Sequence, residues 1–150
     1  MRFCQIDQIA HLDPGNKIEA YRSLDGTEDY LRDHFPRFAV MPGVLMLESL
    51  FQASGLLVRA TENHEAGLVI LRTAKNVKFA DFVQPGQTLR IEAQIMKSEG
   101  RRYTVKAVGY KDDAQAVSGR LIIDCVDTDD DEIVDKHAAL YMKQLTEQLQ

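Results

Sequence analysis

The sequence is poor in several features, and each shortage excludes a class of protein. Its two cysteines, Cys4 and Cys125, lie far apart and form no Cys-x-x-Cys pair, so neither a disulfide framework nor a cysteine-based zinc site is expected. Both are expected to be buried free thiols in a reducing cytoplasm. The longest apolar run, residues 44–58, contains Glu48 and Gln52 and is shorter than the ~20 residues of a membrane span. The N-terminus lacks the pattern of a secretion signal, so we expect a soluble, cytoplasmic protein without membrane insertion.

Positive charge is also in short supply. The formal net charge of -5 and the sequence pI near 5.3 argue against nucleic-acid binding, which needs a dominant positive field. The charge is uneven, because residues 59–111 hold ten Lys and Arg against five Asp and Glu, while residues 112–150 hold three against ten. The middle third could present a basic face to an acidic partner. A sheet surface of mixed charge explains the same pattern equally well.

At 150 residues and 45% hydrophobic content, the chain can bury one core, and we expect a single domain over residues 1–150. Residues 44–60 predict a buried helix, because Pro42 and Gly43 mark its entry and nearly every face is apolar. Residues 24–42 predict a long loop with a short helix around 27–32. A C-terminal helical extension is expected over about 127–150, with acids in its first turn.

The remaining apolar runs alternate with turn residues, which predicts antiparallel strands with short links. The first two form a hairpin around the turn at residues 13–16. The expected strands cover residues 3–9, 17–23, 68–75, 76–82, 88–97, 102–110 and 115–126. One buried helix wrapped by a curved antiparallel sheet is an α+β layout.

The most informative stretch is HFPRFAVMPGVLMLESLFQ, residues 34–52. An ionisable group in an apolar helix is costly unless something uses it, so Glu48 needs an explanation, and His34 is the natural one. A histidine exchanges protons near neutral pH, while desolvation would favour the protonated carboxyl. Gln52 follows Glu48 by four residues, on the same helix face, and could hold the carboxyl in place. The free amides at the helix start, at Gly43, would point toward developing negative charge.

Each of these residues also has a purely structural explanation. His34 could be a loop residue that makes one hydrogen bond. Glu48 could pair across a dimer interface, and Gly43 could relieve crowding at a helix start. Gln52 could be a buried amide satisfied by the backbone. The other histidines fall in turns or in the terminal helix, where they are expected to be solvated, and no metal-ligand cluster stands out.

The combination of these pieces resembles the FabZ/FabA family of 3-hydroxyacyl-acyl-carrier-protein dehydratases. The matching pieces are HFP, VMPGVL and LESLFQASG, with fourteen residues from His34 to Glu48. Weaker similarity extends over about residues 3–124, including NVKFADFVQPGQTL at residues 76–89. The resemblance implies the hot-dog fold, in which a curved antiparallel sheet wraps around a central buried helix, here followed by a C-terminal helix.

The resemblance also implies roles for single residues. His34 matches the catalytic histidine, expected to be the general base, and Glu48 matches the catalytic carboxylate, expected to be the general acid. The Gly43 amide would polarise the thioester carbonyl, the Val40 carbonyl would orient the imidazole, and Gln52 would contact the carboxylate. The implied reaction is dehydration of (3R)-3-hydroxyacyl-acyl-carrier protein to the trans-2-enoyl form, in fatty-acid or related lipid biosynthesis, without metal or redox cofactor.

Partners follow from the same resemblance. In this family the histidine and the carboxylate that work together come from different subunits, so a homodimer or a trimer of dimers is expected. The acyl tunnel is expected beside the helix, lined by Leu45, Leu47, Phe51 and Phe79. Because carrier protein is acidic, its docking face is expected at Arg72, Lys75, Lys78, Arg101 and Arg102.

The chain departs from the family pattern around the histidine. The family commonly has Gly before the histidine, Gly after HFP and Pro before VMPG, where this chain has Asp33, Arg37 and Ala39. Loss of two glycines restricts the backbone there, so loop geometry or substrate range could differ. Two other functions therefore stay open. One is a hot-dog acyl thioesterase, in which the histidine would be idle, and the other is a non-catalytic acyl-binding partner subunit.

Overall fold

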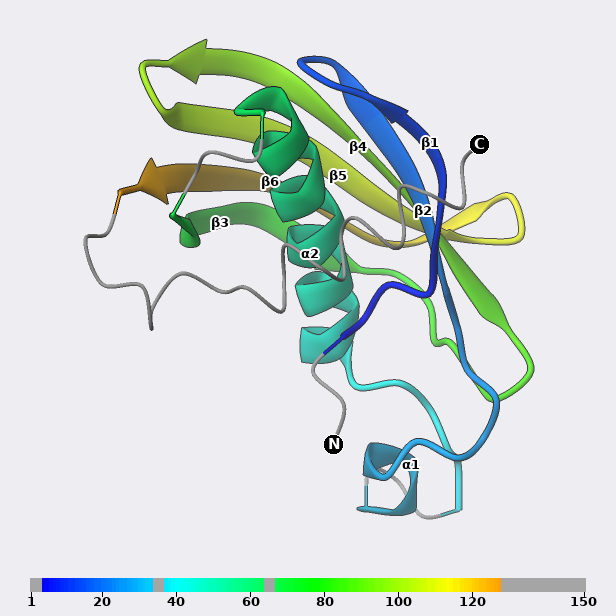
Figure 1. Ribbon diagram of the computed structural model, residues 1–150. Coiled ribbons are helices and arrows are strands. Elements are labelled where there is room, and N and C mark those ends of the chain that lie inside the picture. Colours follow the sequence, from blue (N-terminus) through cyan, green and yellow to red (C-terminus); the bar gives the residue numbers. More distant parts are fainter. Residues whose placement is uncertain (1–3, 34–36, 64–66, 128–150) are drawn as a thin grey trace.

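The computed structural model describes residues 4–33, 37–63 and 67–127. Within these ranges, six antiparallel strands form one curved sheet in the order β1-β2-β4-β5-β6-β3, and the long helix α2 lies against one face of it (Figure 1). The arrangement confirms the expected α+β hot-dog fold. The C-terminal helix expected over about 127–150 lies almost wholly outside the described residues. The strands are β1 Gln8–Asp13, β2 Lys17–Ser23, β3 Leu68–Phe79, β4 Thr88–Glu99, β5 Arg102–Lys111 and β6 Ala114–Val126, and the helices are α1 Tyr30–Asp33 and α2 Gly43–Thr61.

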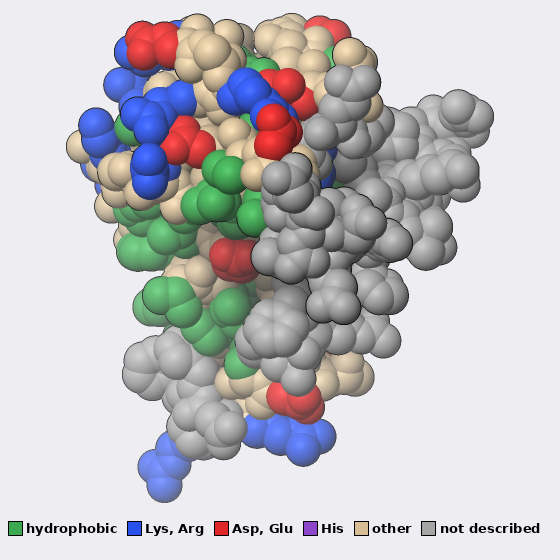
Figure 2. All heavy atoms as spheres, turned by 60° about the vertical axis from the view of Figure 1, so that its left-hand side comes forward, with side chains coloured by type: hydrophobic (Ala, Val, Ile, Leu, Met, Phe, Trp, Pro, Cys, Tyr) green, Lys and Arg blue, Asp and Glu red, His purple; other side chains and the backbone are tan. Residues whose placement is uncertain are grey.

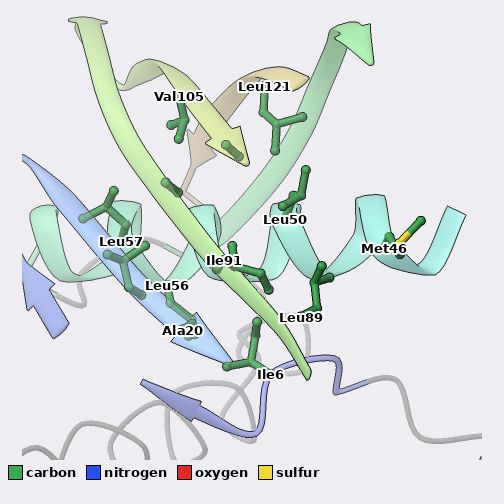
Figure 3. Close-up of a cluster of buried hydrophobic side chains, with 14 of the residues drawn as sticks. Ile6, Ala20, Met46, Leu50, Leu56, Leu57, Leu89, Ile91, Val105 and Leu121 are labelled. Carbon is green, nitrogen blue, oxygen red and sulfur yellow. The ribbon is translucent and has the colours of Figure 1, made fainter. Parts of the chain in front are cut away.

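Helix α2 forms the centre of the core, as its apolar sequence predicts. Pro42 precedes it, and the Pro42 carbonyl accepts hydrogen bonds from the amides of Leu45 and Met46, at 2.9 and 3.2 Å. Full burial of one large apolar side chain contributes about 1.5–3 kcal/mol. The side chains of Met46, Leu50, Leu56 and Leu57 meet those of Ala20, Leu89, Ile91, Val105 and Leu121 from the sheet (Figure 3). The helix is long and apolar enough to cross a membrane. However, 56% of its 18-residue apolar stretch is buried inside this fold, as expected of a core helix.

The N-terminal hairpin is present, but its first strand is displaced from the expected residues 3–9. Strand β1 runs to the turn, where Asp13 pairs with Lys17. Residues 4–6 instead leave the sheet and run beside α2, where the Gln5 backbone N–H donates a hydrogen bond to Gln52. Contact of Gln5 with the helix, together with the hydrogen bond from the Asp7 backbone N–H to the Tyr21 carbonyl at 2.8 Å, therefore sets the path of this segment.

The two strands expected at residues 68–75 and 76–82 are one strand, β3. Asn76 has a positive φ of 53°, and the register with β6 shifts between Lys75 and Lys78. These are the marks of a β-bulge, which bends a strand without ending it. The boundary expected between residues 75 and 76 is therefore a bulge within one strand.

Two smaller expectations also need correction. The short helix expected at residues 27–32 begins at Tyr30, because Asp25, Thr27 and Glu28 form a hydrogen-bonded turn ahead of it. Of the two cysteines expected to be buried, Cys125 is buried but Cys4 is exposed. Gln5 and Ile6, which follow Cys4, turn inward and are each 1% exposed, so Cys4 is left at the surface.

Candidate active site

Glu48 sits near the start of α2, half-buried, on the helix face opposite Leu50. The Gln52 side-chain amide donates a hydrogen bond from Nε2 to Glu48 Oε1 at 3.0 Å, as the four-residue spacing predicts. The Gln5 backbone N–H donates to Gln52 Oε1 at 2.6 Å. Because an N–H cannot face an NH₂ group, this bond fixes which end of the amide points at Glu48. One oxygen of Glu48 must therefore be an acceptor.

This geometry restricts where Glu48 can carry a proton. Its Oε1 accepts from Gln52, so a proton on the carboxyl belongs on Oε2. A carboxyl with one oxygen held and the other oxygen able to carry a proton can act as an oriented acid. The sequence alone did not reveal Gln5, because its contribution is a main-chain amide 47 residues away from Gln52.

The first turn of α2 presents free amides. Pro42 precedes the helix without a side-chain cap, and the first turn contains no acidic residue. Within the described residues, the amides of Gly43 and Val44 have no hydrogen-bond acceptor. Such amides are donors for negative charge on a ligand. A side chain at Gly43 would also lie 3.2 Å from the Phe79 ring, so glycine permits close packing of the ring against the helix start.

The residues that lead into α2 are hydrogen-bonded to the segment between β3 and β4. Val40 is fully buried, and the Met41 amide donates to the Val83 carbonyl at 2.8 Å. This bond fixes the approach to Pro42 and thereby the position of the helix start. The orienting role expected of the Val40 carbonyl depends on His34, which lies outside the described residues. α1 ends at Asp33, immediately before that histidine.

The residues expected to line an acyl tunnel differ in exposure. Leu45, Leu47 and Phe51 are partly buried and pack against the core from α2. Phe79 is 52% exposed and lies against the helix start. Sequence reasoning missed two further aromatics, Phe38 and Phe82, whose rings meet edge to face at 5.5 Å. These two are also about half exposed, which leaves aromatic surface on chain segments flanking the entry to α2.

The basic residues expected to dock an acidic partner are mostly paired. Asp124 lies 2.7 Å from Arg102 and 3.0 Å from Arg72, and Arg101 lies 2.6 Å from Asp127. The hydrogen bond from Arg102 holds the pKa of Asp124 below its usual range. Lys75 and Lys78 are exposed on β3, with no salt-bridge partner among the described residues. These two lysines are therefore the described members of the expected docking face whose charge is not already offset.

Comparison with known proteins gives consistent matches. Residues 1–120 match the profile of the FabA-like domain. The chain is 32% identical over 120 residues to a 3-hydroxyacyl-[acyl-carrier-protein] dehydratase FabZ of Clostridium kluyveri, covering 80% of this chain and 83% of that protein. It is 41% identical over 93 residues to the FabZ of Wolbachia pipientis wMel, covering 62% of this chain and 65% of that one.

Among solved structures, the fold matches the dehydratase heterocomplex ApeI:P from Xenorhabdus doucetiae. The TM-score is 0.66 at 16% identity, over 94% of this chain and 90% of that one. At this identity the match concerns the fold alone.

Proposed function

The chain belongs to the FabA-like domain family, and from that premise we propose that it dehydrates (3R)-3-hydroxyacyl groups on acyl-carrier protein to trans-2-enoyl groups. The observation that carries the proposal is the hydrogen-bonded line from Gln5 through Gln52 to Glu48. It orients one carboxyl near the start of a helix whose first amides have no acceptor in the part of the chain that the structure describes. A carboxyl held in this way suits proton transfer better than a structural ion pair.

The reaction needs a base, an acid and donors for developing charge. We assign His34 as the base that removes the C2 proton, while Glu48 Oε2 gives its proton to the departing C3 hydroxyl. The C2–H and C3–O bonds break, the C2–C3 double bond forms, and water leaves. The Gly43 amide would hold the negative charge that develops on the thioester oxygen. Acid-base groups of this kind contribute on the order of 100- to 10,000-fold in rate.

A second protomer would complete the site. Among the described residues, strand β3 has only β6 as a neighbour and leaves a long edge open, and such edges are templates for pairing with another chain. Ile70 on this strand is 42% exposed, and Val44 on α2 is 70% exposed. Figure 2 shows hydrophobic side chains gathered on one face of the molecule, below a rim of mixed basic and acidic groups. We propose a homodimer, or a trimer of dimers, in which His34 and Glu48 of one site come from different protomers.

The remaining assignments follow from this arrangement. The acyl tunnel would be lined by Leu45, Leu47, Phe51 and Phe79. The reaction would be a step of cytoplasmic fatty-acid or related lipid synthesis. Lys75 and Lys78 would make the main contribution to docking of the acidic carrier protein, with Arg72, Arg101 and Arg102 already paired.

A partner-subunit role is the second candidate. The departures from the family pattern at Asp33, Arg37 and Ala39 support it, because they alter the loop around the histidine. In that case the chain would bind acyl thioesters, and a second, different chain would perform the chemistry.

One assay separates the candidates. The purified protein is supplied with 3-hydroxyacyl-carrier protein of several chain lengths, and enoyl thioester and free thiol are measured together. Enoyl formation that is lost in His34→Ala and in Glu48→Gln, but kept in the exposed control His11→Ala, supports the proposal. Release of free thiol would indicate a thioesterase. Acyl binding without turnover, unaffected by His34→Ala, would indicate a partner subunit.

A further inference from the structure

The segment between β2 and α1 is a compact unit held by its own side chains. The Glu28 carboxylate accepts hydrogen bonds from the amides of Asp25 and Gly26, each at 3.0 Å. The Asp25 carboxylate accepts from the Thr27 amide at 2.8 Å and from the Thr27 hydroxyl at 2.6 Å. These bonds to Thr27 hold the pKa of Asp25 below its usual range. The segment is therefore ordered locally, but these bonds alone do not attach it to the sheet.

Arg22, in β2, makes that attachment. Its side chain is only 11% exposed, and Nη1 donates to both oxygens of Asp7, at 3.1 and 3.2 Å. Nη2 lies 3.8 Å from Glu28 Oε1 on the other side. Asp7 is itself fixed, because it also accepts the Ser23 amide at 2.7 Å. One guanidinium thus joins the segment before β1 to the turn before α1.

Helix α1 also packs beside the Arg22 guanidinium, through Tyr30. Leu31 is 6% exposed and Tyr30 is partly buried against the core. Burial raises the pKa of the Tyr30 hydroxyl, while the neighbouring Arg22 guanidinium acts in the opposite direction. A helix of four residues cannot hold its own shape in water, so tertiary contacts must set the position of α1. The chain reaches His34 directly from its last residue, Asp33.

We infer that Arg22 is a positioning residue for the proposed reaction. By bridging Asp7 and Glu28 it holds residues 25–33 on the sheet, and so it fixes the point from which the chain enters His34. The inference rests on the proposed function of that histidine. Arginine suits this role because its planar fork reaches two carboxylates at once, whereas a lysine is a single point of charge.

The test compares Arg22→Gln and Arg22→Lys with the wild type. Hydrogen exchange of residues 25–33 reports the anchoring, and steady-state kinetics report its consequence. We expect faster exchange in this segment, and kcat reduced roughly 10- to 100-fold with KM within about twofold, since displacement of a catalytic group by about 1 Å can cost that much. Arg22→Lys should be intermediate. Arg90→Gln is the matched control, because Arg90 also pairs with a carboxylate, Glu92, but on neighbouring strand β4.

Several results would overturn the inference. If hydrogen exchange at residues 25–33 is unchanged in Arg22→Gln, Arg22 does not anchor this segment. If exchange is faster but kcat stays at the wild-type value, the anchoring does not affect catalysis. A loss equal to that of Arg90→Gln would show a general effect of charge. If Arg22→Gln does not fold, Asp7→Asn weakens the hold on the guanidinium without removing a hydrogen bond inside residues 25–28, and it must give the same pattern. A wild type without turnover would refute the proposed function and the catalytic link together, and the exchange result would still decide the anchoring.

Discussion

The Gln52 side chain lies between Glu48 and the backbone N–H of Gln5. Because Gln5 donates to Gln52 Oε1, the Gln52 NH₂ group must face Glu48 and donate to it. The backbone of one segment thereby decides that the Glu48 oxygen facing Gln52 acts as a hydrogen-bond acceptor. A hydrogen bond to a charged group contributes about 1.5–3 kcal/mol, enough to control the orientation of a side chain on an otherwise apolar helix face.

Replacing Gln52 tests this arrangement. In Gln52→Leu the carboxyl loses its donor, and we expect kcat to fall roughly 10- to 100-fold, the rate equivalent of about 1.5–3 kcal/mol. Gln52→Glu keeps an acceptor for the Gln5 backbone N–H but places a second carboxyl beside Glu48, so it should also lose activity. The measurement is kcat for hydroxyacyl thioester together with urea unfolding. Gln94→Leu, at an exposed position on β4, is the control, and undiminished kcat in Gln52→Leu would contradict the assignment.

Gly43→Ala should separate activity from stability. Alanine is favoured over glycine in a helix by up to about 1 kcal/mol, but its methyl group would meet the Phe79 ring at 3.2 Å. Because that ring is half exposed it can shift, and we expect little change in the free energy of unfolding. The displaced ring and the new methyl group would crowd the free amide, so kcat should fall about tenfold or more. Equal kcat in Gly43→Ala and wild type would show that this amide is not used.

Stability at high pH should depend on Tyr103. Burial, and the hydrogen bond that its hydroxyl donates to Glu62 Oε1 at 2.6 Å, raise the pKa of Tyr103 above the ordinary value. The folded state therefore keeps a proton that the unfolded chain loses near pH 10. This contribution to stability is complete below about pH 10 and is lost as the pH rises above it.

Urea unfolding at pH 8 and pH 11 measures the effect. The free energy of unfolding should fall less between these values in Tyr103→Phe than in the wild type, although the variant is less stable by roughly 1 kcal/mol at pH 8. Tyr110→Phe, a partly exposed tyrosine on the same strand, should keep the wild-type fall. The same loss in Tyr103→Phe and wild type would contradict the prediction.

Carrier-protein docking should depend on Lys75 and Lys78. Their joint replacement by glutamate should raise KM for hydroxyacyl-carrier protein about tenfold, without changing KM for a hydroxyacyl pantetheine, which has no acidic surface. Salt should raise the wild-type KM for the carrier-protein substrate only. A KM that is insensitive to ionic strength would count against docking at this face.

The fold was predictable wherever a local pattern decides the structure. The apolar run at residues 44–60 and the turn at residues 13–16 gave the helix and the hairpin, because burial and turn chemistry act within a few residues. The path of residues 4–6 and the bulge at Asn76 were not predictable, since contacts with α2 and β6 produce them.

The same distinction applies to the candidate site. The spacing of Glu48 and Gln52 predicts their contact, because both lie on one helix. Gln5 contributes a backbone group, and Arg102 meets Asp124 across two strands, so neither relationship leaves a mark in the local sequence. The expectation of a five-residue basic face overlooked these cross-strand carboxylates.

The most direct test of the account is complementation between two inactive variants. His34→Ala and Glu48→Gln are purified, unfolded together and refolded as a mixture, and turnover of hydroxyacyl-carrier protein is compared with that of each variant alone. If each site takes its histidine and its carboxyl from different protomers, mixed dimers contain one intact site, and activity returns to about a quarter of the wild-type value when the variants assort at random. No activity in a mixture shown to contain mixed dimers would contradict the shared site.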